Sequence, residues 1–107
     1  MEIKQYQIIA VRIDAASGDS PENTRRCIVI SPDEMNRYLR TVIIAPLAEV
    51  SAGYPTRPKI KHANKTSRAV LDQVTTIEKQ RVLEVLGDLQ KPEIKKIKTV
   101  LREIFID

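Results

Sequence analysis

The sequence predicts a mainly β protein with helices (α+β), built as a small barrel or curled antiparallel sheet with a C-terminal amphipathic helix packed on it. Two observations predict this class. Short, apolar, β-branched runs recur up to residue 86 and are separated by turn-forming residues. From residue 91 onward, apolar side chains instead recur at helical spacing. With 107 residues, the chain is expected to form one domain that covers residues 1–107.

The first strand is predicted over Tyr6–Asp14, where branched apolar residues occur without a helical period. The segment Ala16–Asn23 contains Ser, Gly, Asp and Pro, so it is predicted to be a loop. Cys27–Ile30 is a continuous apolar run, as expected of a strand that is covered on both faces.

A short helix is predicted to begin at Ser31, which has the side chain of a helix N-cap. Pro32 would occupy the first helical position and Glu34 would complete the cap. Thr41–Leu47 is predicted to be a second buried strand. Pro46 cannot donate a ladder hydrogen bond, so this end of the strand is expected at an edge or a bulge.

The second half of the chain contains further short strands and one long helix. A loop is predicted at Val50–Tyr54, and strands are predicted over Pro58–Lys61, Ala69–Leu71 with Val74–Ile77, and Val82–Leu86. Lys91–Phe105 is predicted to be helical, with Pro92 near its start, where a missing N–H costs nothing. Its apolar residues occupy one helical face: Ile94, Ile97, Val100, Leu101, Ile104 and Phe105.

The composition narrows the class of partner and the compartment. A net charge of +4 favours an anionic partner such as RNA or an acidic protein. The single cysteine, Cys27, cannot form an intramolecular disulfide and lies in an apolar run, which predicts an inert buried thiol in a reducing cytoplasm. The segment MEIKQYQII lacks the apolar core of a signal peptide, and no apolar run approaches the ~18 residues of a membrane span.

Three segments recur together in one known family. They are the run TRRCIVISPDEMNRYLRTVIIAP at Thr24–Pro46, then YPTR at Tyr54–Arg57, then LDQ at Leu71–Gln73. In this order and spacing they resemble the MazF/PemK family of bacterial toxins, whose members read roughly KTRPCVIISPDEMNR, TVIIAP, YPTR and LDQIRT. The resemblance runs without gaps from about Lys4 to Phe105.

The resemblance implies an SH3-like barrel of the CcdB/PemK-like toxin fold and a homodimer. It implies the toxin of a type II toxin–antitoxin system: an mRNA interferase that cleaves single-stranded RNA at a short sequence and uses no metal or other cofactor. It also implies a partner, an acidic MazE-like antitoxin whose disordered tail covers the RNA groove.

Arg25 falls on the arginine of the family's TRP motif, and the resemblance implies that it faces the scissile phosphate. An RNase without a metal uses the ribose 2′-OH as nucleophile, and the protein must stabilise the charge that develops on the phosphorane. A guanidinium is permanently charged and bidentate toward phosphate oxygens, which suits this role. The alternative is a solvated arginine at the start of a strand.

Other positions depart from the family pattern. Ala48 occupies the position of a catalytic threonine, and Ser20 that of a glutamate, in the sequence Gly18-Asp19-Ser20. Arg26 replaces a proline and Thr75 a second arginine. Removing one oriented donor costs about 10²–10³ in rate, so an attenuated enzyme is expected. Asp19, Glu49, Ser51 and Arg26 are the candidates to stand in for the missing groups.

A basic stretch lies between Glu49 and Asp72, where no acidic residue occurs. Its cationic residues are Arg57, Lys59, Lys61, Lys65 and Arg68, with His62 among them. Such a stretch is either a track for RNA phosphates or an ordinary solvated hairpin. With the motif positions, the residues expected to bind RNA are Arg26, Arg57, Lys59, Lys61, Asp72 and Gln73.

His62, the only histidine, has no cysteine neighbours and is expected at the surface without a catalytic or metal-binding role. Two alternatives to an active RNase remain open. One is a catalytically impaired relative that still binds RNA or an antitoxin, which Ala48 and Ser20 favour. The other is a CcdB-like inhibitor of DNA gyrase. The TRRCIVIS and LDQ segments, and the lack of the expected gyrase-binding C-terminal ending in IFID, argue against that second alternative.

Overall fold

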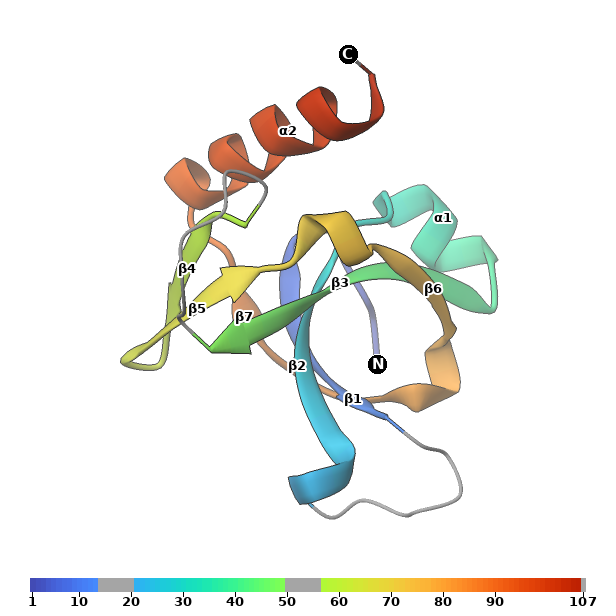
Figure 1. Ribbon diagram of the computed structural model, residues 1–107. Helices are drawn as coiled ribbons and strands as arrows, with labels where there is room; N and C mark the ends of the chain where they lie inside the picture. Colours follow the sequence, from blue (N-terminus) through green and yellow to red (C-terminus); the bar gives the residue numbers. More distant parts are fainter. Residues whose placement is uncertain (14–20, 50–56, 107) are drawn as a thin grey trace.

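The computed structural model describes residues 1–13, 21–49 and 57–106, and in this part of the chain a curled antiparallel sheet carries a C-terminal helix (Figure 1). The strand order is β4-β5-β3-β2-β1-β7, and β6 also pairs with β3. The strands are β1 Gln7–Arg12, β2 Thr24–Val29, β3 Thr41–Glu49, β4 Lys59–His62, β5 Lys65–Ala69, β6 Thr75–Glu78 and β7 Val82–Asp88. The helices are α1 Asp33–Tyr38 and α2 Lys91–Phe105, with 3-10 turns η1 Pro21–Asn23, η2 Leu71–Gln73 and η3 Lys79–Arg81. The predicted fold class is confirmed.

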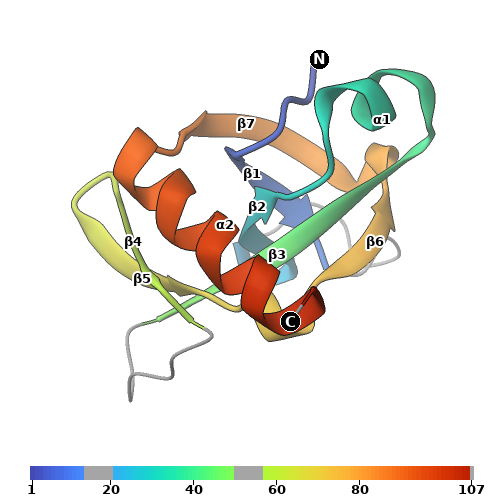
Figure 2. The same ribbon diagram turned by 90° about the horizontal axis from the view of Figure 1, so that it is seen from above.

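The sheet has a hydrophobic core on each of its two faces. The first core lies inside the curl formed by β1, β2, β3, β6 and β7, and it contains Ile9, Val11, Cys27, Val29, Val42, Ile44, Ile77 and Val82. The second lies between the opposite face and α2, which crosses that face in Figure 2, and it contains Ile8, Ile28, Ala45, Leu47, Ile60, Ala69, Leu71 and Ile97. Because side chains alternate along a strand, single strands such as β2 and β3 contribute to both cores.

Strand β3 is interior along its length. One edge pairs with β2 from Ile44 to Pro46, and the other pairs first with β6 and then with β5. The main-chain oxygen of Pro46 accepts a 2.8 Å hydrogen bond from the N–H of Val70, so the missing N–H of Pro46 points to the same edge, at the break between β6 and β5. Neither predicted alternative, an edge or a bulge, is found at Pro46, because the proline lies where an interior strand changes partner.

The start of α1 differs from the prediction. The N-cap is Pro32 and makes no side-chain cap bond. Ser31 is buried, donates its hydroxyl hydrogen to Asn36 Oδ1, and accepts a 3.0 Å bond from the N–H of Ile43. The predicted Ser31 cap is wrong because tertiary partners occupy its side chain. A capping box does occur at α2, where Gln90 and Glu93 cap each other.

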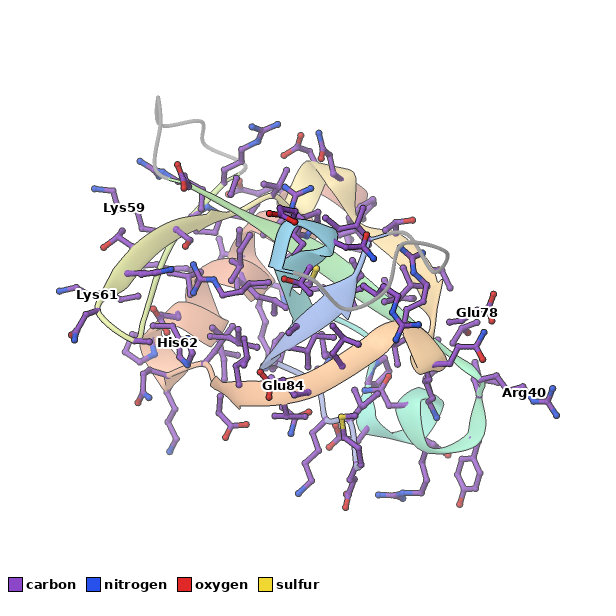
Figure 3. The ribbon with its side chains drawn as sticks, turned by 90° about the horizontal axis from the view of Figure 1, so that it is seen from below. Arg40, Lys59, Lys61, His62, Glu78 and Glu84 are labelled. Carbon is purple, nitrogen blue, oxygen red and sulfur yellow. The ribbon has the colours of Figure 1, made fainter. Side chains whose placement is uncertain are left out.

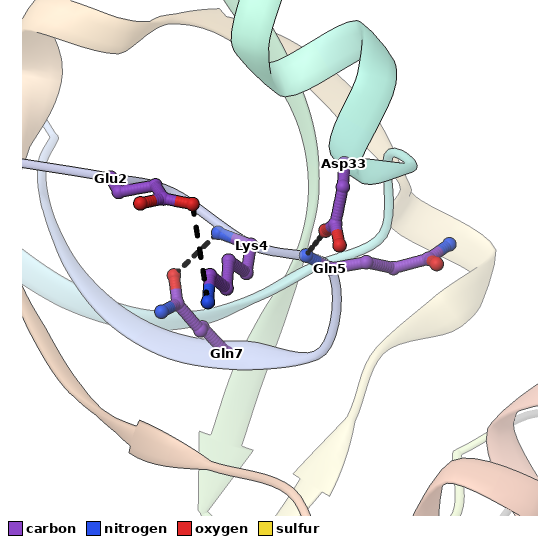
Figure 4. Close-up of polar contacts among 5 residues, drawn as sticks. All are labelled: Glu2, Lys4, Gln5, Gln7 and Asp33. Carbon is purple, nitrogen blue, oxygen red and sulfur yellow. Dashed lines mark hydrogen bonds and ion pairs between the residues drawn. The ribbon is translucent and has the colours of Figure 1, made fainter.

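The segment before β1 is held against α1 (Figure 4). The N–H of Gln5 donates to Asp33 Oδ1 at 2.7 Å, and the N–H of Lys4 donates to Gln7 Oε1 at 2.7 Å. The ion pair between Lys4 and Glu2 is long, 3.9 Å, and exposed, so it contributes little. The acidic residue at the start of α1 thus fixes the entry to the sheet.

Of the other predicted elements, the loop Val50–Tyr54 and most of the loop Ala16–Asn23 lie outside the described residues, and one predicted strand disagrees with the structure. The structure confirms four predicted elements, which it forms as β1, β2, β7 and α2. The predicted strand Ala69–Leu71 is wrong: β5 ends at Ala69, and Leu71 begins the turn η2, which inserts Leu71 into the second core. In the described part of the chain, no helix is long and apolar enough to cross a membrane.

The hairpin between β4 and β5 contains strained backbone. Its two turn residues, Ala63 and Asn64, have φ of 52° and 62°, as a two-residue hairpin turn with the sheet's twist requires. Asparagine tolerates this region, whereas alanine is penalised by roughly 1 kcal/mol. We expect Ala63→Gly to raise the free energy of unfolding by about 0.5–1 kcal/mol in urea denaturation.

Ala10→Gly in β1 is the matched control, because it introduces glycine where the strand gains nothing from it. This change should lower the free energy of unfolding by about 0.5–1 kcal/mol. Equal losses in the two variants would show that the turn at Ala63 is not strained.

Candidate nucleic-acid interface

The sheet register aligns four positions across four strands. Lys59 of β4 pairs with Arg68 of β5, and Arg68 in turn pairs with Ala48 of β3. The β2–β3 register passes through Cys27 and Pro46, and its extension by two residues sets Arg25 across from Ala48. Residues directly opposite each other lie on the same face. We call Lys59, Arg68, Ala48 and Arg25 the cross-strand row, which spans about 14 Å at the usual strand spacing.

The two adjacent arginines of β2 lie on opposite faces. Arg25 shares its face with Cys27 of the first core, and its side chain is exposed. Arg26 shares its face with Ile28 of the second core, and its Nη2 donates to Ser67 Oγ. Arg25 therefore lies on the face of the cross-strand row, and Arg26 lies on the opposite face.

Arg68 is half-buried in the middle of the row. Its Nη1 donates to the main-chain oxygen of Arg57 at 3.0 Å. Its Nε is buried and has no hydrogen-bond partner in the described residues. The neighbouring Ala48 offers only a methyl group, so it provides no polar partner. Arg68 belongs to the basic stretch, but no motif marks it.

Arg57 and Asp72, both expected to contact RNA, bind each other. Nε and Nη2 of Arg57 each donate to a different carboxylate oxygen of Asp72, both at 3.0 Å. This bidentate pair is only partly exposed and compensates the charge of Arg57. Gln73, in the same turn as Asp72, is exposed.

The two lysines of β4 point away from the molecule in Figure 3. Lys59 belongs to the cross-strand row, and Lys61 lies on the same face opposite Thr66. The main-chain N–H of Lys61 donates to Glu93 Oε2 at 2.8 Å, which ties β4 to the first turn of α2. Both ammonium groups are left available to an anionic ligand on this face.

His62 lies on the other face of β4, against β7 (Figure 3). A Cβ at Gly87 would come within 2.8 Å of His62 Nε2, so a larger residue at position 87 would require the ring to move. The ring is half-buried and its Nδ1 has no partner in the described residues, so the expected surface position of His62 is wrong. It helps to hold the hairpin on the sheet, away from Arg25.

Cys27 is buried as predicted, and two arginines lie close enough to influence the pKa of its thiol. Burial raises the pKa of its thiol to about 11, although the positive charges of Arg25 and Arg81 act to lower it. Arg81 donates from Nε to the main-chain oxygen of Arg12 at 2.9 Å and also bonds Ile13. Sequence reasoning missed Arg81, because only the pairing of β7 with β1 brings it to the end of the curl near Arg25.

Several candidates remain outside the site. Ser20, Asp19, Ser51 and Tyr54 lie outside the described residues. Glu49 is exposed but lies opposite Ser67, on the face away from Ala48. In residues 1–13, 21–49 and 57–106, no group of three or more His, Cys, Asp or Glu side chains could hold a metal ion.

Solved structures of known proteins share this fold. MazF from Deinococcus radiodurans in its Form-III complex with MazE has a TM-score of 0.81, 15% identity, and coverage of 97% of this chain and 96% of that chain. An endoribonuclease from a mycobacterial species, in complex with its cognate antitoxin, has a TM-score of 0.78, 20% identity, and coverage of 94% and 92%. Mycobacterium tuberculosis toxin MazF-mt6 has a TM-score of 0.76, 16% identity, and coverage of 92% and 95%.

At these identities the solved structures show the fold alone, and no curated protein sequence matches the chain. The family assignment comes from residues 4–105, which match the pattern of one family over almost the whole length. The chain belongs to the family of PemK-like, MazF-like toxins of type II toxin–antitoxin systems.

Proposed function

We propose that this toxin is a metal-independent endoribonuclease that cleaves single-stranded mRNA at a short sequence. The main support for this proposal is the cross-strand row, in which Lys59, Arg68 and Arg25 flank Ala48 on one face. A row of cations across strands matches the backbone of a single-stranded nucleic acid, which binds chiefly through its phosphates. The family membership supplies the reaction class for this surface.

Arg25 is the main catalytic group of the proposal. The ribose 2′-hydroxyl loses its proton as its oxygen attacks phosphorus, the bond from phosphorus to the 5′-oxygen breaks, and that oxygen takes up a proton, so the products carry a 2′,3′-cyclic phosphate and a 5′-hydroxyl. The exposed guanidinium of Arg25 stabilises the charge that develops on the phosphorane. Its high pKa as a residue type makes arginine a poor base, so Arg25 does not remove the 2′ proton.

The proposed activity is attenuated, because Ala48 replaces a hydroxyl beside the scissile phosphate. A methyl group can neither orient the phosphate nor relay a proton. The same observation favours a second candidate function, a catalytically impaired toxin that still binds RNA or its antitoxin through the row. Cleavage and binding must therefore be measured separately.

The proposed partners are a second copy of the chain and a MazE-like antitoxin. Solved relatives of the same fold are bound to their antitoxins. An acidic, disordered antitoxin tail would complement the cations that RNA also uses. Apolar side chains exposed at the end of α2, at Phe105 and Ile106, give a second copy an apolar surface to cover.

Catalysis is tested at Arg25 and Ala48. We expect Arg25→Ala to abolish cleavage of single-stranded RNA in EDTA while the fold remains intact, because the phosphorane loses its cation. Ala48→Thr should raise the cleavage rate at least ~10-fold, which is the usual worth of one oriented donor. Brisk cleavage by the unaltered chain that Ala48→Thr does not change would mean that other residues form the site.

Self-association is tested by sedimentation equilibrium. We expect a species of twice the 12.2 kDa chain mass at micromolar concentration. A single 12.2 kDa species under these conditions would contradict the dimer.

A further inference from the structure

We infer that Arg68 is a second phosphate-binding group of this site, positioned across Ala48 from Arg25. The inference rests on the proposed function and adds a residue that no family motif marks. Arg68 is directly opposite Ala48 in the β3–β5 ladder and directly opposite Lys59 in the β4–β5 ladder. Cross-strand neighbours have Cβ atoms about 4.5–5.5 Å apart, so a group bound over Ala48 lies within reach of the Arg68 side chain.

The hydrogen bonds of Arg68 leave it ready for an anion. Its contact with the Arg57 carbonyl is to a neutral acceptor, and within the described residues it forms no ion pair with a carboxylate. Its Nε donor is unsatisfied as well, but it is buried, so a ligand approaching from solvent meets the outer nitrogens of the guanidinium. A half-buried cation without an anionic partner is costly, and an anion bound at those outer nitrogens lowers the cost. The phosphates are the anionic groups of RNA, since its bases are neutral. Their oxygens match the planar fork of donors that a guanidinium presents.

Arg57 and Asp72 act as positioning residues for Arg68. The two 3.0 Å bonds between Arg57 and Asp72 hold the Arg57 side chain. The neighbouring carbonyl of Arg57 then receives Arg68 Nη1, which fixes one end of the guanidinium. Of the two arginines, Arg68 is therefore the one free to bind phosphate, and Arg57 orients it.

The roles of the two phosphate-binding arginines differ. Arg25 acts on the charge of the transition state, so its loss reduces kcat. Arg68 holds the backbone before and during the reaction, so its loss raises KM more than it lowers kcat. A small side chain at position 48 leaves the space between them open to the phosphate.

The test uses a single-stranded 2′-O-methyl oligonucleotide of mixed sequence, which cannot be cleaved by 2′-OH attack. Its affinity is measured by fluorescence anisotropy from about 50 to 200 mM salt. Arg68→Ala should weaken binding roughly tenfold and lower the slope of log affinity against log salt by about 0.7. Arg68→Lys should keep the slope, because the charge remains, but bind less tightly, because the planar fork is lost.

Lys65→Ala is the matched control, since Lys65 is an exposed cation of the same strand on the opposite face. It should leave affinity and salt slope unchanged. If the unaltered chain binds the oligonucleotide but Arg68→Ala behaves like Lys65→Ala, the inference on Arg68 is overturned and the proposed function stands. If the unaltered chain neither binds this probe nor cleaves RNA, both are overturned. If Arg68→Ala does not fold, an affinity of Arg68→Lys equal to that of the unaltered chain overturns the inference.

Discussion

The hydrogen-bond register of β3 is the constraint on which the rest of the structure depends. This strand pairs with β2 on one edge and with β6 and then β5 on the other. Its side chains enter both cores, Val42 and Ile44 on one face and Ala45 and Leu47 on the other. A slip of one residue would exchange the two sets and turn Ala48 away from the face of Arg25. The positions of the β4–β5 hairpin, the curl and the site thus follow from one strand.

The pairing of charges separates the cations that hold the fold from those left for a ligand. Arg57 is compensated by Asp72, Arg26 bonds Ser67 over the second core, and Arg81 binds main-chain oxygens at the end of β1. Arg25, Lys59 and Arg68 share one face of the sheet and form no ion pair with a carboxylate among the described residues. A count of basic residues in the sequence does not distinguish these two groups, because the distinction depends on which partners the fold brings to each side chain.

The fold and the family could be predicted from the sequence because their signals are local. The spacing of apolar residues gave the bounds of α2, and the TRRCIVIS and LDQ segments marked the toxin family. Ser31 failed as a cap because the side chain of Asn36 and the N–H of Ile43 compete for its hydroxyl, a tertiary effect. The row was not predictable, because the register of β4 and β5 against β3 depends on a two-residue turn and a partner change at Pro46.

The burial of Cys27 gives the molecule a built-in probe of its own opening. The thiol is 3% exposed between β1 and β3, and its raised pKa keeps it protonated near neutral pH. Thiol reagents attack the thiolate, so the closed protein is shielded both by access and by protonation. Labelling then proceeds only through states in which β2 separates from its neighbours. The rate of modification at this single cysteine measures how often the barrel opens, without an engineered label.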